Sequence, residues 1–384
     1  MPVQRELFAL LKAFASLQAP KSLVWPENIS VATIHDFLLH SIFLNPHFTS
    51  YPPCAQHRKS FWKWAIENME REISRSPSEA DDFEIDERIY ECYLGLLPLS
   101  GPAPGSSNAD SRQQICDRGL PVNQRPPRES YLTHYWQSAD RDPCPNDTQQ
   151  LDDVSRYQTF TLLESQNLIE GGTTGLRTWP ASFRLARYLS QHTEIVAHKR
   201  VLELGSGVGF LGALIATLQI QQLAASSRNL YPGSLYLTDI NDEVLTRCQN
   251  NIRLDCNLSS THPDIHVRTL DWCISLDCEQ RNVLVSFIEN EVKPDIVVGA
   301  DLVFDPFLIP ALVGVLSLVL SGSARSAERH AFIALTNRNP TTMNSFVDSV
   351  KDAGLGIVEF SSSILDPYDE FAGEENVYLF RVTA

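Results

Sequence analysis

Apolar residues recur at helical spacing in the first part of the chain. The runs 7–14, 34–42 and 61–73 each place them three or four positions apart, which predicts amphipathic helices with one buried face. The Phe and Trp residues within these runs are interpreted as core packing. Residues 1–96 are therefore predicted to form an N-terminal helical region.

The periodicity is lost between residues 97 and 154, where Pro, Gly, Ser and Asp predominate. These residues interrupt regular structure, so the segment is predicted to be a linker. One island, 131–136, alternates apolar and polar positions. That alternation predicts a short strand that pairs with another part of the chain.

Apolar runs typical of strands alternate with helical runs from residue 155 to residue 384. Strands are predicted at 201–204, 234–238, 265–270, 295–299, 331–336, 356–361 and 376–382, and helices include 182–191, 242–254 and 342–353. The first five strands fit a parallel, doubly wound sheet. The last two lack a crossover helix between them and are predicted to be antiparallel. The predicted fold is thus α/β, with a Rossmann-like, mostly parallel seven-stranded sheet that ends in an antiparallel pair.

Composition and charge narrow the class of protein. The chain has 384 residues, 43% of them hydrophobic and 20% charged, with a formal net charge of -16. An acidic total argues against direct nucleic-acid binding and is compatible with a basic protein partner. The eight cysteines lack zinc-site spacing, and we find no secretory segment and no run long enough to span a membrane. We expect a metal-free monomer in the cytoplasm.

The stretch "VLELGSGVGFLG" at 201–212 contains two overlapping glycine fingerprints. Read from Gly205 it resembles a loop for S-adenosylmethionine, with Glu203 two residues before it. Read from Gly207 it resembles a dinucleotide loop that ends at Gly212. A strand that ends near Leu204 would place Gly205 at the turn, which favours the first interpretation. Gly212 is then explained by close packing of the next helix on the sheet. We expect cofactor contacts from Glu203, Gly205, Ser206, Gly207 and Gly209.

Acidic and aromatic residues follow the later strands at the same edge of the sheet. Asp239 ends the second strand, and its acceptor-only carboxylate suits ribose hydroxyls. Asp271 and the flat Trp272 follow the third strand, where an adenine would lie. Ala300, Asp301 and Phe304 follow the fourth. We see no residues that mark the second nucleotide of a dinucleotide.

Together with "GGTTGLRTWPAS" at 171–182, these residues resemble the seven-strand S-adenosylmethionine-dependent protein-lysine methyltransferases. The resemblance implies that Trp179 and Ala300 border the cofactor. The family's acid-x-x-aromatic motif corresponds to Asp301–Phe304, with Phe where Tyr is frequent. The segments "FLNPHFTSYPP" and "YLTHYW" are similar to the subgroup that methylates eukaryotic elongation factor 2, which implies that protein as the substrate.

The predicted chemistry is methyl transfer to a lysine amine, with Asp301 and Phe304 as the catalytic residues. A lysine ammonium must lose its proton before it attacks a sulfonium. A carboxylate can hold and orient the ammonium, and an aromatic face can stabilise the shared positive charge. Three alternatives remain: the same chemistry on another protein or nucleophile, a dinucleotide-dependent oxidoreductase, and a non-catalytic cofactor-binding module.

Overall fold

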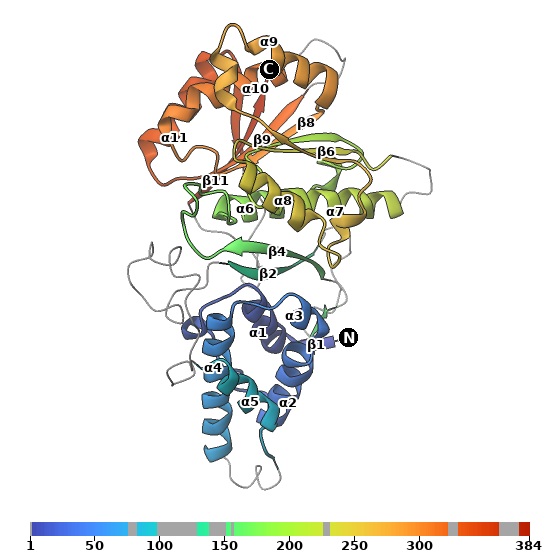
Figure 1. The fold of residues 1–384 in the computed structure, drawn as a ribbon, viewed down its shortest axis with the longest axis vertical. Helices are drawn as coiled ribbons and strands as arrows, with labels where there is room; N and C mark the ends of the chain where they lie inside the picture. The colour runs from blue at the N-terminus through green and yellow to red at the C-terminus, as the bar shows by residue number, and fades with distance from the viewer. Residues whose placement is uncertain are drawn as a thin grey trace, which may run out of the picture. The chain divides into compact units, whose positions relative to one another are not determined.

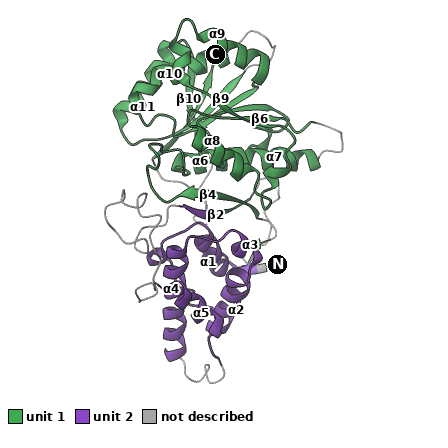
Figure 2. Cartoon of the chain, viewed as in Figure 1, with its two compact units in different colours: residues 1, 133–384 green, residues 2–132 purple. Residues whose placement is uncertain are grey.

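The computed structural model describes residues 2–75, 83–97, 129–137, 151–154, 157–225, 231–321, 329–360 and 376–384. They fall into two compact units, residues 2–132 and residues 133–384 (Figure 2). Most of the predicted linker lies outside the described residues. The division into 1–96, 97–154 and 155–384 therefore stays a prediction.

The first unit is built from helices, and the three predicted helical runs are confirmed. Its elements are β1 (Pro2–Gln4), α1 (Arg5–Ala15), η1 (Pro20–Ser22), α2 (Val31–Leu38), η2 (Leu39–Phe43), α3 (Pro46–Ser50), α4 (Ala55–Arg75) and α5 (Glu87–Gly95). Aromatic rings fill its core: Phe14 lies 4.8 Å from Phe61 and 5.2 Å from Phe48 between ring centroids. Phe61 and Trp62 are almost fully buried, as the core-packing interpretation requires.

The second unit contains the predicted seven-stranded sheet, which confirms the fold class. Its strands, in spatial order, are β10 (Gly356–Phe360), β11 (Val377–Thr383), β9 (His330–Thr336), β8 (Ile296–Ala300), β5 (Arg200–Leu204), β6 (Ser234–Asp239) and β7 (Ile265–Thr269). Strands β5 to β9 are mutually parallel. β11 runs antiparallel to β9 and to β10, as predicted for the terminal pair.

Helices cover both faces of this sheet (Figure 1). One layer holds α6 (Pro180–Gln191), α7 (Phe210–Ala225) and α8 (Asp242–Ile252), and the other holds α9 (Arg281–Ser286), α10 (Ile309–Leu320) and α11 (Pro340–Asp352). Short helical turns connect them: η5 (Thr193–Ile195), η6 (Leu258–Thr261), η7 (Trp272–Leu276), η8 (Phe287–Val292) and η9 (Pro306–Leu308). The most apolar of the helices, α10, is buried in the core. None of the helices described is both long and apolar enough to cross a membrane.

A separate two-stranded sheet is formed by β2 (Glu129–Trp136) and β4 (Gln158–Ser165), and β3 (Leu151–Asp153) lies between them in sequence. β2 confirms the strand predicted at 131–136, whereas β4 was not predicted. Two asparagine side chains form hydrogen bonds with the backbone of β4, in the way that a neighbouring strand would. Asn257 exchanges two hydrogen bonds with the backbone of Thr161. Asn251 does the same with Leu163 and also donates to the carbonyl of Val208, in the glycine loop.

We expect Asn251→Ala to lower the free energy of unfolding by about 2–4 kcal/mol, because it leaves several buried backbone groups without partners. The native side chain accepts from Leu163 N at 2.8 Å and donates to Val208 O at 2.9 Å. Denaturant unfolding measures the change. Asn250→Ala is the matched control, since Asn250 is the exposed neighbour on the same helix. Equal stabilities for the two variants would contradict the assigned role.

Candidate active site

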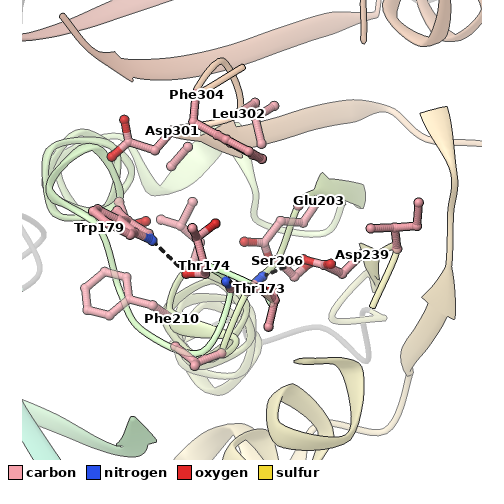
Figure 3. A pocket seen from close by; sticks show the side chains of 18 of the residues that line it. Thr173, Thr174, Trp179, Glu203, Ser206, Phe210, Asp239, Asp301, Leu302 and Phe304 are labelled. Carbon is pink, nitrogen blue, oxygen red and sulfur yellow. Dashed lines mark hydrogen bonds between the residues drawn. The ribbon is translucent and has the colours of Figure 1, made fainter. Parts of the chain in front are cut away.

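A cavity of about 330 Å³ lies at the carboxyl ends of the central strands (Figure 3). Strand order reverses there, because the chain proceeds from β5 outward to β7 and then returns to place β8 on the other side of β5. Open α/β sheets bind ligands at such a point. All the predicted site residues except Gly209 line this cavity: Trp179, Glu203, Gly205, Ser206, Gly207, Asp239, Asp271, Trp272, Ala300, Asp301 and Phe304.

The glycine loop follows β5 directly, which confirms the register predicted from the sequence. β5 ends at Leu204, so Gly205 begins the turn. Gly207 has a φ of +52°, and a Cβ there would lie 3.2 Å from the carbonyl oxygen of Gly175. Gly209 faces away from the cavity, where a Cβ would meet Cys248 Sγ at 2.9 Å. Gly212 packs against Leu237 of β6, as the packing interpretation predicted.

Ser206 fixes the loop to the neighbouring strand. Its backbone N–H donates to the carbonyl of Thr238 at 2.8 Å, and its hydroxyl accepts from Thr238 N at 2.9 Å. The hydroxyl of Thr238 in turn donates to the carbonyl of Glu203. The loop is therefore held in place before any ligand enters, which lowers the conformational cost of binding.

Two carboxyl groups line the cavity between β5 and β6. Burial raises the pKa of Glu203 to about 8, against a hydrogen bond from Ser206 that lowers it. Glu203 Oε2 is buried and has no hydrogen-bond partner among the described residues. Burial also raises the pKa of Asp239, and backbone N–H groups partly offset this. Gly207 N donates to Asp239 Oδ2 at 3.3 Å, so the second acid also supports the loop.

We expect Glu203 to make stability depend on pH. Its ordinary pKa is 4.5, and its pKa in the folded chain is about 8, so the folded state holds this proton more tightly. The contribution of Glu203 to stability is therefore greatest below pH 4.5, falls as the pH rises through this window, and is constant above pH 8. Unfolding free energies of the wild type and Glu203→Gln at several pH values measure it. A difference between them that does not vary from pH 5 to pH 8 would contradict the assignment.

Asp271 and Trp272 stand at the end of β7. Asp271 Oδ1 accepts from Cys273 N at 2.8 Å and so begins the turn η7. The Trp272 ring is half-buried and lies beside the glycine loop, 3.6 Å from where a Cβ of Gly205 would be. The loop and the indole together form a flat wall of the cavity.

Asp301 lies at the opposite end of the cavity from Asp239, beside Trp179 (Figure 3). Its φ is +53°, a conformation that is rare outside glycine and that is found at functional sites. Oδ1 accepts from Thr336 N at 2.9 Å. Oδ2 accepts from Thr336 Oγ1 at 3.0 Å and from Ala181 N at 3.3 Å, and pairs with Arg338 Nη2 at 3.3 Å. The Arg338 guanidinium lies 5.0 Å from the centroid of the Trp179 ring.

The segment before α6 forms a further wall of the cavity, and its residues other than Trp179 were not predicted. Thr173, Thr174, Gly175 and Thr178 line the cavity. Trp179 Nε1 donates to the carbonyl of Thr174 at 2.9 Å. The buried carboxylate of Glu164, at the end of β4, accepts from both the backbone and the hydroxyl of Thr178. Recognition of strand β4 in the sequence would have indicated this wall, because the end of β4 holds the segment in place through Glu164.

The geometry defines a doubly wound α/β domain with a nucleotide-type cavity, and comparison with known proteins identifies its class. The sequence profile of the family described as lysine methyltransferase matches residues 161–353. The chain belongs to this family, whose methyl donor is S-adenosylmethionine. This membership replaces the dinucleotide interpretation of the loop.

Named relatives carry the comparison further. Protein-lysine N-methyltransferase EFM3 of Chaetomium thermophilum is 31% identical over 89% of this chain and 86% of its own length. Protein-lysine N-methyltransferase EEF2KMT of Bos taurus is 30% identical over 55% of this chain, and the match spans 62% of that relative, less than two thirds of its length. A solved structure, the glycopeptide N-methyltransferase MtfA complexed with sinefungin, aligns with 56% of this chain and 90% of its own at a TM-score of 0.35 and 11% identity.

Proposed function

We propose that this protein transfers methyl groups from S-adenosylmethionine to a lysine of eukaryotic elongation factor 2. The observation that carries the proposal is that one cavity gathers acidic and aromatic side chains from the ends of four neighbouring strands. The substrate is supported by the resemblance of the N-terminal segments and by the similarity to the relative named protein-lysine N-methyltransferase EEF2KMT, which extends over 55% of this chain. The cytoplasmic location and the monomeric state stay predictions.

The cavity fits the proposed cofactor. Asp239 offers a carboxylate for the ribose hydroxyls, and Trp272 with Asp271 offers an adenine wall. Glu203 keeps a buried oxygen without a partner for the methionine end. Trp179 and Ala300 border the cofactor, and Gly205, Ser206 and Gly207 let the backbone approach it. Gly209 contributes indirectly, through the packing of α8 against the loop.

When bound, S-adenosylmethionine supplies an electrophilic methyl group on a positively charged sulfur. In the proposed mechanism Asp301 and Phe304 orient the acceptor amine in line with it. Asp301 Oδ1 accepts one hydrogen bond within the protein and, since a carboxylate oxygen has two lone pairs, can accept a second from the lysine. Phe304 is 58% exposed at the cavity and offers its face to the cationic group. Orientation of the two reactants provides most of the acceleration.

Two measurements test this function. Calorimetry should show binding of S-adenosylmethionine and none of NAD. Mass spectrometry of elongation factor 2 from cells that lack the protein should show one lysine without its methyl groups, and re-expression should restore them. An unchanged methylation pattern of elongation factor 2 would reject this substrate. A lack of S-adenosylmethionine binding would reject the proposed methyltransferase activity.

A further inference from the structure

Two phenylalanine side chains are exposed in the turn that follows β8, one of them at the cavity. Phe304 is 58% exposed and Phe307 is 90% exposed, and among the residues that the structure describes no other phenylalanine is exposed. They occupy one turn after β8, together with Leu308, and Phe304 and Leu308 line the cavity. Large apolar side chains exposed together beside a functional site are typical of an interaction surface.

The turn that carries Phe307 has a defined conformation. Asp305 Oδ1 accepts from Phe307 N at 3.0 Å, and the carbonyl of Asp305 accepts from Leu308 N at 3.0 Å. Pro306 occupies the first position of the helical turn η9, which packs against α10 and α11. A partner that covers Phe307 therefore does not have to order the backbone of this turn, which lowers the conformational cost of binding at an anchor residue.

The cofactor does not explain both rings. Phe304 borders the cavity and can be covered from inside it, whereas Phe307 does not line the cavity and remains exposed when the cavity is filled. The occupant that must approach this rim is the protein that presents the acceptor lysine. Asp305 places a carboxylate between the two rings in sequence, and the chain has a net charge of -16, so a basic surface is favoured.

We infer that Phe307, with Phe304 beside it, is a docking anchor for the segment of the substrate protein next to the acceptor lysine. That segment carries an apolar side chain on a basic surface, which packs on the Phe307 ring while the lysine enters past Phe304. The inference rests on the proposed methyltransferase function and adds a determinant of substrate binding outside the cavity.

Phe307→Ala tests the anchor, with Phe307→Leu as the conservative variant. Val358→Ala is the control, because Val358 is 56% exposed on the edge strand β10 and does not line the cavity. Each protein is assayed with isotope-labelled S-adenosylmethionine and, as acceptor, either purified elongation factor 2 or a eukaryotic extract. We expect Phe307→Ala to raise KM for the acceptor about tenfold, in line with loss of a buried aromatic contact. kcat and cofactor affinity should stay unchanged, and Phe307→Leu should recover most of the loss.

The other outcomes overturn the inference in distinguishable ways. If the wild type labels a protein other than elongation factor 2, the proposed substrate is wrong and the same KM comparison on that protein still decides the role of Phe307. If the wild type labels nothing, both proposals are wrong. An unchanged KM for Phe307→Ala, or an equal loss of kcat at saturation, would reject the docking role of Phe307 and leave the proposed methyltransferase function standing. Sedimentation that shows a wild-type dimer and a monomeric Phe307→Ala with normal KM would assign the surface to self-association instead.

Discussion

Gly207→Val is expected to weaken S-adenosylmethionine binding by about 10- to 100-fold. Gly207 has a φ of +52°, which a β-branched residue avoids, and a Cβ there would lie 3.2 Å from the carbonyl oxygen of Gly175. The loop or the facing segment must therefore move, at a cost of about 1–3 kcal/mol, and each 1.4 kcal/mol is tenfold in affinity. Calorimetric titration with S-adenosylmethionine measures the effect.

Gly354→Val is the matched control, because it introduces similar backbone strain at a position outside the cofactor site. Gly354 has a φ of +78°, no atom lies within 4 Å of its would-be Cβ, and it ends α11 away from the cavity. The two variants should be destabilised to a similar extent, while only Gly207→Val loses affinity. Equal cofactor affinity in both would show that the approach of Gly207 to Gly175 does not shape the site.

Asp301→Asn is expected to lower kcat by about 100-fold and to change cofactor affinity by less than threefold. Asparagine tolerates the positive φ of Asp301 and keeps the shape of the side chain, so the fold should persist. The substitution removes the negative charge that pairs with Arg338. It also replaces one acceptor oxygen with a donor amide, although the N–H groups of Thr336 and Ala181 both need an acceptor. Loss of a preorganised electrostatic contact commonly costs this much in turnover.

Steady-state kinetics over substrate and cofactor, together with a thermal melt, distinguish catalysis from folding. Asp348→Asn is the control, because Asp348 is an exposed acid on α11 that does not line the cavity. A normal kcat for Asp301→Asn would remove this residue from the catalytic proposal. Similar losses of kcat and cofactor affinity would instead indicate a purely structural role.

The central sheet was predictable because its signals are local. Most strands of the sheet are short apolar runs, β7 alternates apolar and polar residues, and the turn after Leu204 follows directly from the end of β5. Strand β4 was missed because its stabilisation comes from side chains far along the chain: Asn251 and Asn257 contact it across 88 and 96 positions. Residues 159–162 do alternate polar and apolar positions, which is a local strand signal, but the contacts with the two asparagines exist only after the fold has formed.

The placement of the candidate site residues was predictable to the same extent, and for the same reason. Residues that end or follow strands, such as Asp239 and Asp301, could be placed at one edge of the sheet from the sequence. The partners of Asp301 could not, because Ala181 and Thr336 come from elements 120 positions before it and 35 after it. The wall formed by Thr173 and Thr174 could not be predicted either, because its position depends on β4.

The contact between Asp301 and Thr336 has a consequence for synthesis of the chain. The cavity needs residues from Thr173 to Arg338, and its last wall follows β9, the fifth parallel strand to be made. A chain that still lacks β9 on the ribosome holds the glycine loop and Ala181, but not Thr336 and Arg338, the other partners of Asp301. The residues assigned to the cofactor, from Trp179 to Ala300, are therefore all made before β9, whereas the acceptor side of the cavity at Asp301 is completed only after it.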